Sequence, residues 1–129
     1  MRSRWLSTLI AFGLSALPCL AARADDADML FAKTVRPLFE RKCFECHSSK
    51  ADELKGKLKL ETVELVLKGG ATGPAVIAGD VENSFLLRAI RYQEDDFQMP
   101  PSGRLSDEDI SIVEKWVKAL KTGDKKAGR

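Results

Sequence analysis

Cys43-Phe44-Glu45-Cys46-His47 is the stretch around which the rest of this 129-residue chain is arranged. On a helical turn, residues three positions apart lie on one face, so the thiols of Cys43 and Cys46 can reach the same flat partner. His47 is the single histidine of the chain, and it can offer an imidazole nitrogen to a metal directly beside the two thiols. The spacing therefore brings two sulfurs and one nitrogen ligand to one short turn.

Three kinds of site use a pair of cysteines at this spacing: a thiol redox pair, half of a zinc site, or the attachment point of a c-type haem. A zinc site usually needs four ligands, whereas the chain has one histidine and only Cys19 besides these two cysteines. A thioredoxin-like pair is expected beside a βαβ pattern, which the sequence does not show. Haem attachment uses all three residues: Cys43 and Cys46 form thioethers to one haem c, and His47 ligates its iron.

The first 24 residues have the three parts of an export signal. Arg2 and Arg4 precede an apolar run over residues 5–20, and Ala22-Arg23-Ala24 forms a cleavage site. We expect a signal peptide over residues 1–24 and an exported or periplasmic chain that is soluble after cleavage.

Two kinds of membrane anchor are alternatives to cleavage. Gly13 and Pro18 break the apolar run, which is short for a bilayer span of about 20 residues. Pro18 directly before Cys19 makes that cysteine a poor lipidation site. We therefore expect no membrane span in the mature chain.

The charge of the mature chain is close to balanced. Loss of Arg2, Arg4 and Arg23 with the signal leaves 18 basic residues against 19 acidic ones. Nucleic acid is not an expected partner, because such proteins need a clear basic excess or patch. The length suggests one domain, over residues 25–120, followed by a flexible basic tail over residues 121–129.

Apolar periodicity predicts an all-α fold. Pro37 interrupts the first helix, because proline cannot donate a backbone hydrogen bond. The expected helices run from the acidic residues near 25 to Cys43, over 62–68 between Thr62 and Gly69-Gly70, over about 81–91 after Asp80, and over about 107–120 after Ser106.

The mature chain offers two methionines as a sixth iron ligand, which is the partner that histidine has in electron-transferring cytochromes. Met29 precedes the haem motif in the first helix and is expected in the core. Met99 stands before Pro100-Pro101, which stiffen its loop and hold it in an extended conformation. Met99 could instead fill a gap in the core, but we favour ligation because no second histidine competes for the iron.

The chain resembles class I cytochromes c and, more narrowly, the planctomycete-type cytochrome c domain, over about residues 29–120. The matching pieces are Val35-Arg36-Pro37-Leu38, Cys43–His47, Lys68-Gly69-Gly70 with Gly73-Pro74, Gly79-Asp80 with Ser84, Met99-Pro100-Pro101, and Leu105-Ser106-Asp107-Glu108 before Trp116. The resemblance implies N- and C-terminal helices that cross around one haem, with long connecting loops.

The resemblance also implies roles for individual residues. Cys43 and Cys46 carry the thioethers, and His47 and Met99 are the axial iron ligands. The carbonyl group of Pro74 accepts a hydrogen bond from Nδ1 of His47, and Trp116 lies at the helix crossing.

The expected function is one-electron transfer by a single-haem cytochrome with no catalytic residues, whose redox partner protein is unknown. One alternative is a haem-based sensor or gas-binding module with an open sixth site, and another is a haem-free thiol redox protein. For the carrier, we expect Met99 to face His47 across a slot walled by apolar side chains, for which the candidates are Leu60, Val76, Phe85 and Ile90.

Overall fold

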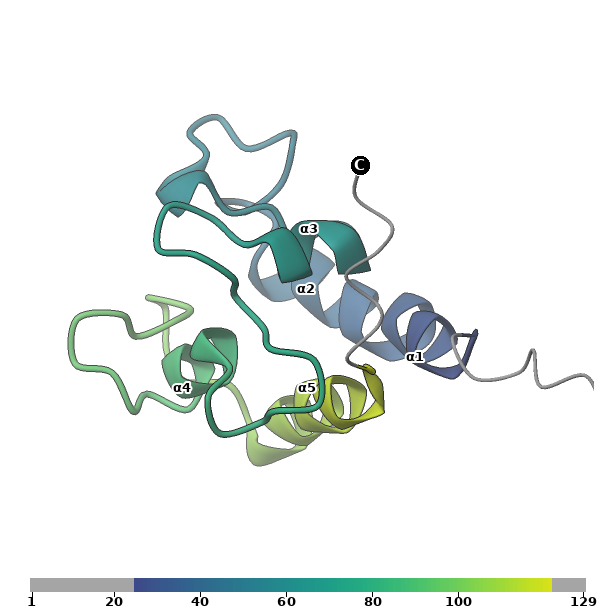
Figure 1. The fold of residues 1–129 in the computed structure, drawn as a ribbon. Coiled ribbons are helices and arrows are strands. Elements are labelled where there is room, and N and C mark those ends of the chain that lie inside the picture. Colours follow the sequence, from purple (N-terminus) through teal and green to yellow (C-terminus); the bar gives the residue numbers. More distant parts are fainter. Residues whose placement is uncertain (1–24, 122–129) are drawn as a thin grey trace, which may run out of the picture.

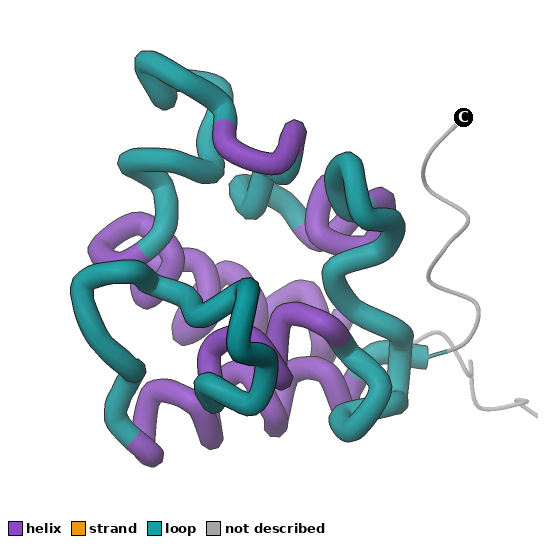
Figure 2. Tube along the Cα trace, turned by 90° about the vertical axis from the view of Figure 1, so that its left-hand side faces the viewer, coloured by secondary structure: helices purple, strands orange, loops and turns teal. Residues whose placement is uncertain are grey.

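A computed structural model describes residues 25–121, which therefore exclude the expected signal peptide and all but the first residue of the expected tail. Its elements in chain order are α1 (Asp25–Leu30), a π-helical turn η1 (Phe31–Val35), α2 (Arg36–Lys42), a short 3₁₀ turn η2 (Lys55–Lys57), α3 (Val63–Lys68), α4 (Phe85–Ile90) and α5 (Asp107–Ala119). Figure 1 shows the helices joined by long loops, and Figure 2 shows no strand in the part of the chain described. The prediction of an all-α chain is confirmed for the secondary structure of residues 25–121.

The first helical stretch runs through Pro37 without a break, as α1, η1 and α2 follow one another directly. The proline ring would clash with the carbonyl group of Lys33 in a regular α-helix. Lys33 lies within the wider turn η1, where the backbone N–H of Arg36 bonds to the carbonyl oxygen of Phe31, five residues back. This wide turn accommodates Pro37 near the start of α2 and carries the helix to Lys42, directly before the first cysteine.

Helix α3 has both of its predicted ends. The hydroxyl oxygen of Thr62 accepts a hydrogen bond from the backbone N–H of Leu65, at 3.3 Å. Gly69 ends the helix with φ +74°, a conformation that favours glycine. The predicted start and end of this helix are therefore confirmed. Both signals act over only a few residues.

Helix α4 is shorter than predicted. The carboxylate of Asp80 accepts bonds from the backbone and side-chain amides of Asn83, at 3.0 and 2.8 Å, and so closes a turn instead of capping a helix. The helix begins only after Ser84, whose buried hydroxyl accepts a bond from the backbone N–H of Ile77. The prediction of a helix over 81–91 was therefore wrong by about one turn at its start.

Helix α5 is capped as predicted by Ser106, whose hydroxyl oxygen accepts the backbone N–H of Asp109 at 3.1 Å. Replacing Ser106 with alanine is expected to lower the free energy of unfolding by about 0.5–2 kcal/mol, because one N–H at the helix start loses its partner. Urea denaturation of the haem-loaded protein measures this. The exposed Ser102 in the preceding turn is the matched control, and Ser102→Ala should stay within about 0.5 kcal/mol of the wild type.

One hydrophobic core joins the first helical stretch to α5. Trp116 of α5 is fully buried and lies on Phe31, with ring centroids 5.1 Å apart. Phe31 in turn meets the edge of Phe39, at 6.2 Å between centroids. We expected Trp116 to pack on the N-terminal helix near Val35 or Phe39. It does pack on the N-terminal stretch, and its ring contact is Phe31.

Met29 does not belong to this core, contrary to expectation. Its side chain is 51% exposed, whereas Phe31, two residues later, is 4% exposed. Successive helical residues are about 100° apart, so Met29, Leu30 and Phe31 cannot all face the core.

Candidate functional site

The cysteines and the histidine lie on a turn that directly continues α2. Cys43 is the C-cap of that helix. The backbone N–H of His47 bonds to the carbonyl oxygen of Cys43 at 2.9 Å, which is the spacing of an α-helical turn. The local geometry that the motif requires is therefore present.

The imidazole ring of His47 is oriented by the backbone of a later loop. Nδ1 of His47 lies 3.3 Å from the carbonyl oxygen of Leu58. A carbonyl oxygen can only accept, so Nδ1 carries the proton and Nε2 remains as the ring nitrogen for a metal. A bond of this kind fixes the ring and raises its basicity as a ligand.

The structure thus gives Leu58 the role that the resemblance implied for Pro74. Pro74 is exposed in the loop before α4, whereas Leu58 lies eleven residues after His47. Sequence reasoning missed Leu58 because a backbone carbonyl group can come from any residue type.

The loop that carries Leu58 is held against the turn that carries His47. The backbone N–H of Lys55 bonds to the carbonyl oxygen of Cys46 at 3.1 Å, and that of Leu60 bonds to the carbonyl oxygen of His47 at 3.0 Å. At the far end, the backbone and hydroxyl groups of Ser49 both donate to Glu61, and these bonds lower the pKa of that carboxyl group. Leu58 is therefore positioned from both sides.

Cys43 lies in apolar surroundings. Its side chain packs against the hydrophobic core, and burial raises the pKa of its thiol to about 12, an effect that the nearby Lys42 only partly offsets. Both Cys43 and Cys46 are free thiols. Thiol–disulfide enzymes need a lowered pKa, so Cys43 is unsuited to that chemistry, whereas an apolar setting suits attachment of a porphyrin.

Met99 lies at the edge of the same core. Its backbone N–H bonds to the carbonyl oxygen of Ala89 in α4 at 3.1 Å. The hydroxyl group of Tyr92 donates to the carbonyl oxygen of Pro100, the next residue. The half-buried side chain of Met99 packs on the hydrophobic cluster that Cys43 and Leu58 also contact.

The apolar residues expected to wall a slot are mostly core residues. Leu60, Val76 and Ile90 are each 1% exposed, because other protein atoms cover them, and this differs from the expected open slot. Phe85 is half-buried and packs on the exposed ring of Phe97, with centroids 5.3 Å apart. The mutual orientation of His47 and Met99 stays a prediction.

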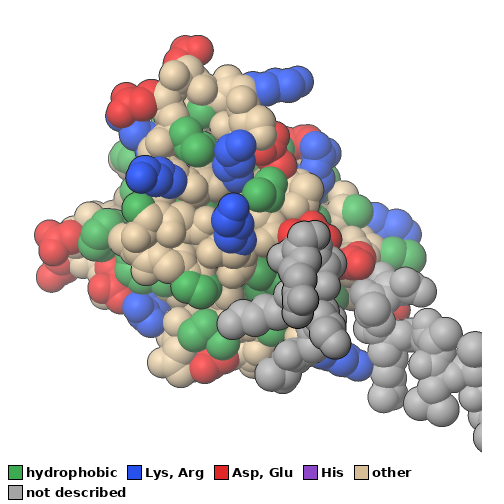
Figure 3. All heavy atoms as spheres, turned by 45° about the horizontal axis from the view of Figure 1, so that its top comes forward, with side chains coloured by type: hydrophobic (Ala, Val, Ile, Leu, Met, Phe, Trp, Pro, Cys, Tyr) green, Lys and Arg blue, Asp and Glu red, His purple; other side chains and the backbone are tan. Residues whose placement is uncertain are grey.

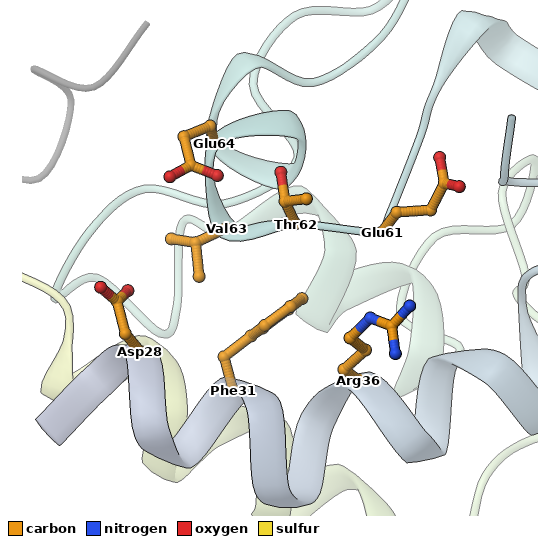
Figure 4. A pocket seen from close by; sticks show the side chains of 7 residues that line it. All are labelled: Asp28, Phe31, Arg36, Glu61, Thr62, Val63 and Glu64. Carbon is orange, nitrogen blue, oxygen red and sulfur yellow. The ribbon is translucent and has the colours of Figure 1, made fainter. Parts of the chain in front are cut away.

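A separate shallow cavity of about 280 Å³ lies between the first helical stretch and the start of α3. Figure 4 shows its charged side chains around the apolar Phe31 and Val63. The cavity is lined by Asp28, Phe31, Arg36, Glu61, Thr62, Val63 and Glu64, and so by none of the predicted site residues. Within residues 25–121, no three His, Cys, Asp or Glu side chains come together in a way that could hold a metal ion.

The surface over the loops and α3 carries charges of both signs. Figure 3 shows Lys and Arg side chains separated by other surface atoms, with Asp and Glu side chains around them. Some of these charges are paired, as in the contact of 2.6 Å between Lys55 and Glu53. This mixed character agrees with the balanced charge of the sequence.

One of the comparisons with known proteins finds a matching family. A family model described as planctomycete cytochrome C matches residues 43–103, from the first cysteine to the loop after Met99. This match over residues 43–103 agrees with the resemblance to the planctomycete-type cytochrome c domain that the sequence showed. No curated protein and no solved structure matches the chain.

The match to a cytochrome c family model indicates haem binding and electron transfer, and it implies a covalently bound haem c. The cytochrome match begins at the predicted attachment cysteine and includes both expected axial ligands. None of the helices over residues 25–121 has the length and apolar character needed to span a bilayer.

The donor set of this cytochrome domain fits the group that its family implies. Two free thiols three residues apart precede an imidazole whose Nδ1 is already bonded, so that Nε2 is left for iron. Cys43 and Met99 both pack against the hydrophobic core, so apolar side chains lie near each of them.

Proposed function

We propose that this protein is an exported, single-haem cytochrome c of the class I fold that carries one electron at a time. Cys43 and Cys46 would hold the haem through thioethers, and His47 and Met99 would be its axial ligands. The observation that carries the proposal is the bond from Nδ1 of His47 to Leu58, directly beside the two thiols.

A haem c bound here would supply a one-electron iron couple. The task of the chain is to keep the ligands in one geometry in both oxidation states. Leu58 does this for His47 by fixing the ring, and Ala89 does it for Met99 by fixing its backbone. A thioether from Met99 would also raise the reduction potential relative to a second histidine.

The first test is the mass of the purified exported protein. We expect one haem added to a chain that begins at Asp25, and we expect the haem to resist extraction with acidified acetone because thioethers are covalent. The mass of the bare polypeptide would contradict haem attachment. A haem-bearing chain with residues 1–24 still present would contradict only the predicted cleavage.

A visible spectrum separates the proposal from its alternatives. A sharp low-spin reduced spectrum supports the carrier, and a high-spin spectrum that changes with carbon monoxide supports the sensor. A protein without a Soret band would be a thiol redox protein, although the raised pKa of Cys43 disfavours that chemistry.

A further inference from the structure

Three glycines after α3, Gly69, Gly70 and Gly73, form a tight turn. The backbone N–H of Gly70 bonds to the carbonyl oxygen of Gly73 at 3.0 Å, and the N–H of Gly73 bonds back to Gly70 at 3.1 Å. A Cβ atom on Gly69 would lie 1.9 Å from the carbonyl oxygen of Gly73. The turn therefore cannot form with a side chain at position 69.

This turn lies directly on the loop that carries Leu58. The backbone N–H of Ala71 bonds to the carbonyl oxygen of Gly56 at 2.7 Å. A Cβ atom on Gly70 would lie 2.3 Å from that same oxygen, 3.0 Å from Cβ of Leu58 and 3.1 Å from its Cα. Gly70 is thus a point of close contact between the two loops, and the contact leaves no room for a methyl group.

The opposite side of the same loop faces the histidine. Leu58 accepts the Nδ1 bond of His47, and the N–H of Leu60 bonds to the carbonyl oxygen of His47. Residues 55–60 therefore lie between the glycine turn on one side and the haem motif on the other. A side chain added at position 70 would therefore displace the backbone of Leu58, whose carbonyl group bonds to His47.

We propose that Gly70 is a positioning residue for His47, acting through Leu58. The inference rests on the proposed function, in which His47 is an axial ligand. By allowing the glycine turn to close on Gly56 and Leu58, Gly70 keeps the Leu58 carbonyl oxygen on Nδ1 and so sets the orientation and donor strength of the imidazole.

The test is Gly70→Ala in the haem-loaded protein. The φ angle of Gly70 lies outside the left-handed region, so alanine adds a steric contact without backbone strain. The added methyl group should displace Leu58 and weaken its bond to Nδ1. A less basic imidazole stabilises ferric iron less, so the reduction potential should rise.

Two further measurements report on the geometry. Proton NMR of the ferric protein should show altered hyperfine shifts of the His47 ring, because its orientation is no longer fixed. Hydrogen exchange of the Leu60 and Ala71 amides should become faster, because both bonds connect to the displaced loop.

Gly56→Ala is the matched control in the same loop. Its φ of +58° makes alanine mildly strained, but a Cβ atom there meets nothing within 4 Å. It should lower stability while leaving the potential and the His47 shifts unchanged. Ala71→Pro is a second variant that tests the same contact. It removes the N–H that bonds to Gly56 and should therefore also raise the reduction potential. It provides the test if Gly70→Ala yields no folded protein.

The outcomes are distinct. An unchanged potential in both Gly70→Ala and Ala71→Pro, or an equal rise in Gly56→Ala, would overturn the positioning role. The visible spectrum of the wild type is recorded first. A wild type without haem would overturn both the proposed function and the inference. If the wild type has a low-spin spectrum, an unchanged potential in the variants overturns the inference alone.

Discussion

Replacing Met99 with alanine is expected to convert a low-spin cytochrome into one with high-spin or water-ligated iron and a lower reduction potential. The thioether would be the sixth ligand, and the methyl group of alanine cannot replace it. The backbone of this loop is held by bonds from Met99 to Ala89 and from Tyr92 to Pro100, neither of which involves the methionine side chain. The loop should therefore keep its place, so that the change reports on ligation. Visible and electron paramagnetic resonance spectra, with a redox titration, measure it.

Met29→Ala is the matched control, since Met29 is the other methionine of the expected mature chain. Its side chain is 51% exposed, so the substitution should leave the spectrum unchanged and shift the free energy of unfolding by no more than about 0.5 kcal/mol. A low-spin spectrum that survives in Met99→Ala would contradict ligation by Met99. Binding of carbon monoxide by the wild type itself would favour the sensor.

Features that depend on a few neighbouring residues could be predicted from the sequence. The caps at Thr62 and Ser106 and the stop at Gly69 all act within one helical turn, and the structure has all three. The motif at Cys43–His47 is similarly local, and the family match begins at its first residue.

Features that depend on long-range packing could not be predicted from the sequence. The partner of Nδ1 of His47 is a backbone atom of Leu58, which no side-chain pattern marks. The resemblance implied Pro74 because a Gly-Pro pair follows the haem motif in class I cytochromes c. In this chain the connection from His47 to that pair is long. The loop over residues 55–60 provides the acceptor instead.

Helix α4 shows why a local signal can also mislead. Asp80 is a good capping residue, yet its carboxylate is occupied by Asn83, and Ser84 is buried with its hydroxyl bonded to backbone groups. These contacts hold residues 81–84 in a turn, so the helix starts at Phe85. Whether an aspartate caps a turn or a longer helix depends on where the following residues pack.

The contact between Trp116 and Phe31 joins the two ends of the described chain. Trp116 is fully buried in α5. Phe31 lies in the wide turn η1, and α2 separates this turn from the haem motif. Among residues 25–121, Nε1 of Trp116 is also a buried side-chain nitrogen without a hydrogen-bond partner. The indole therefore stabilises the fold by its apolar area, while its N–H opposes that effect.

Trp116→Ala is accordingly expected to lower the free energy of unfolding by about 3–5 kcal/mol, because it removes the largest buried side chain and leaves a cavity between α5 and η1. Trp116→Phe is the matched variant. It keeps a ring on Phe31 and removes the unpaired N–H, whose burial costs about 1–3 kcal/mol, so that its net loss of stability should be much smaller. Urea denaturation of the haem-loaded proteins, followed by far-ultraviolet circular dichroism, measures both. Equal losses in the two variants would contradict a stabilising contact between the aromatic ring and Phe31, and a negligible loss in Trp116→Ala would show that this contact does not hold the N-terminal helix on α5.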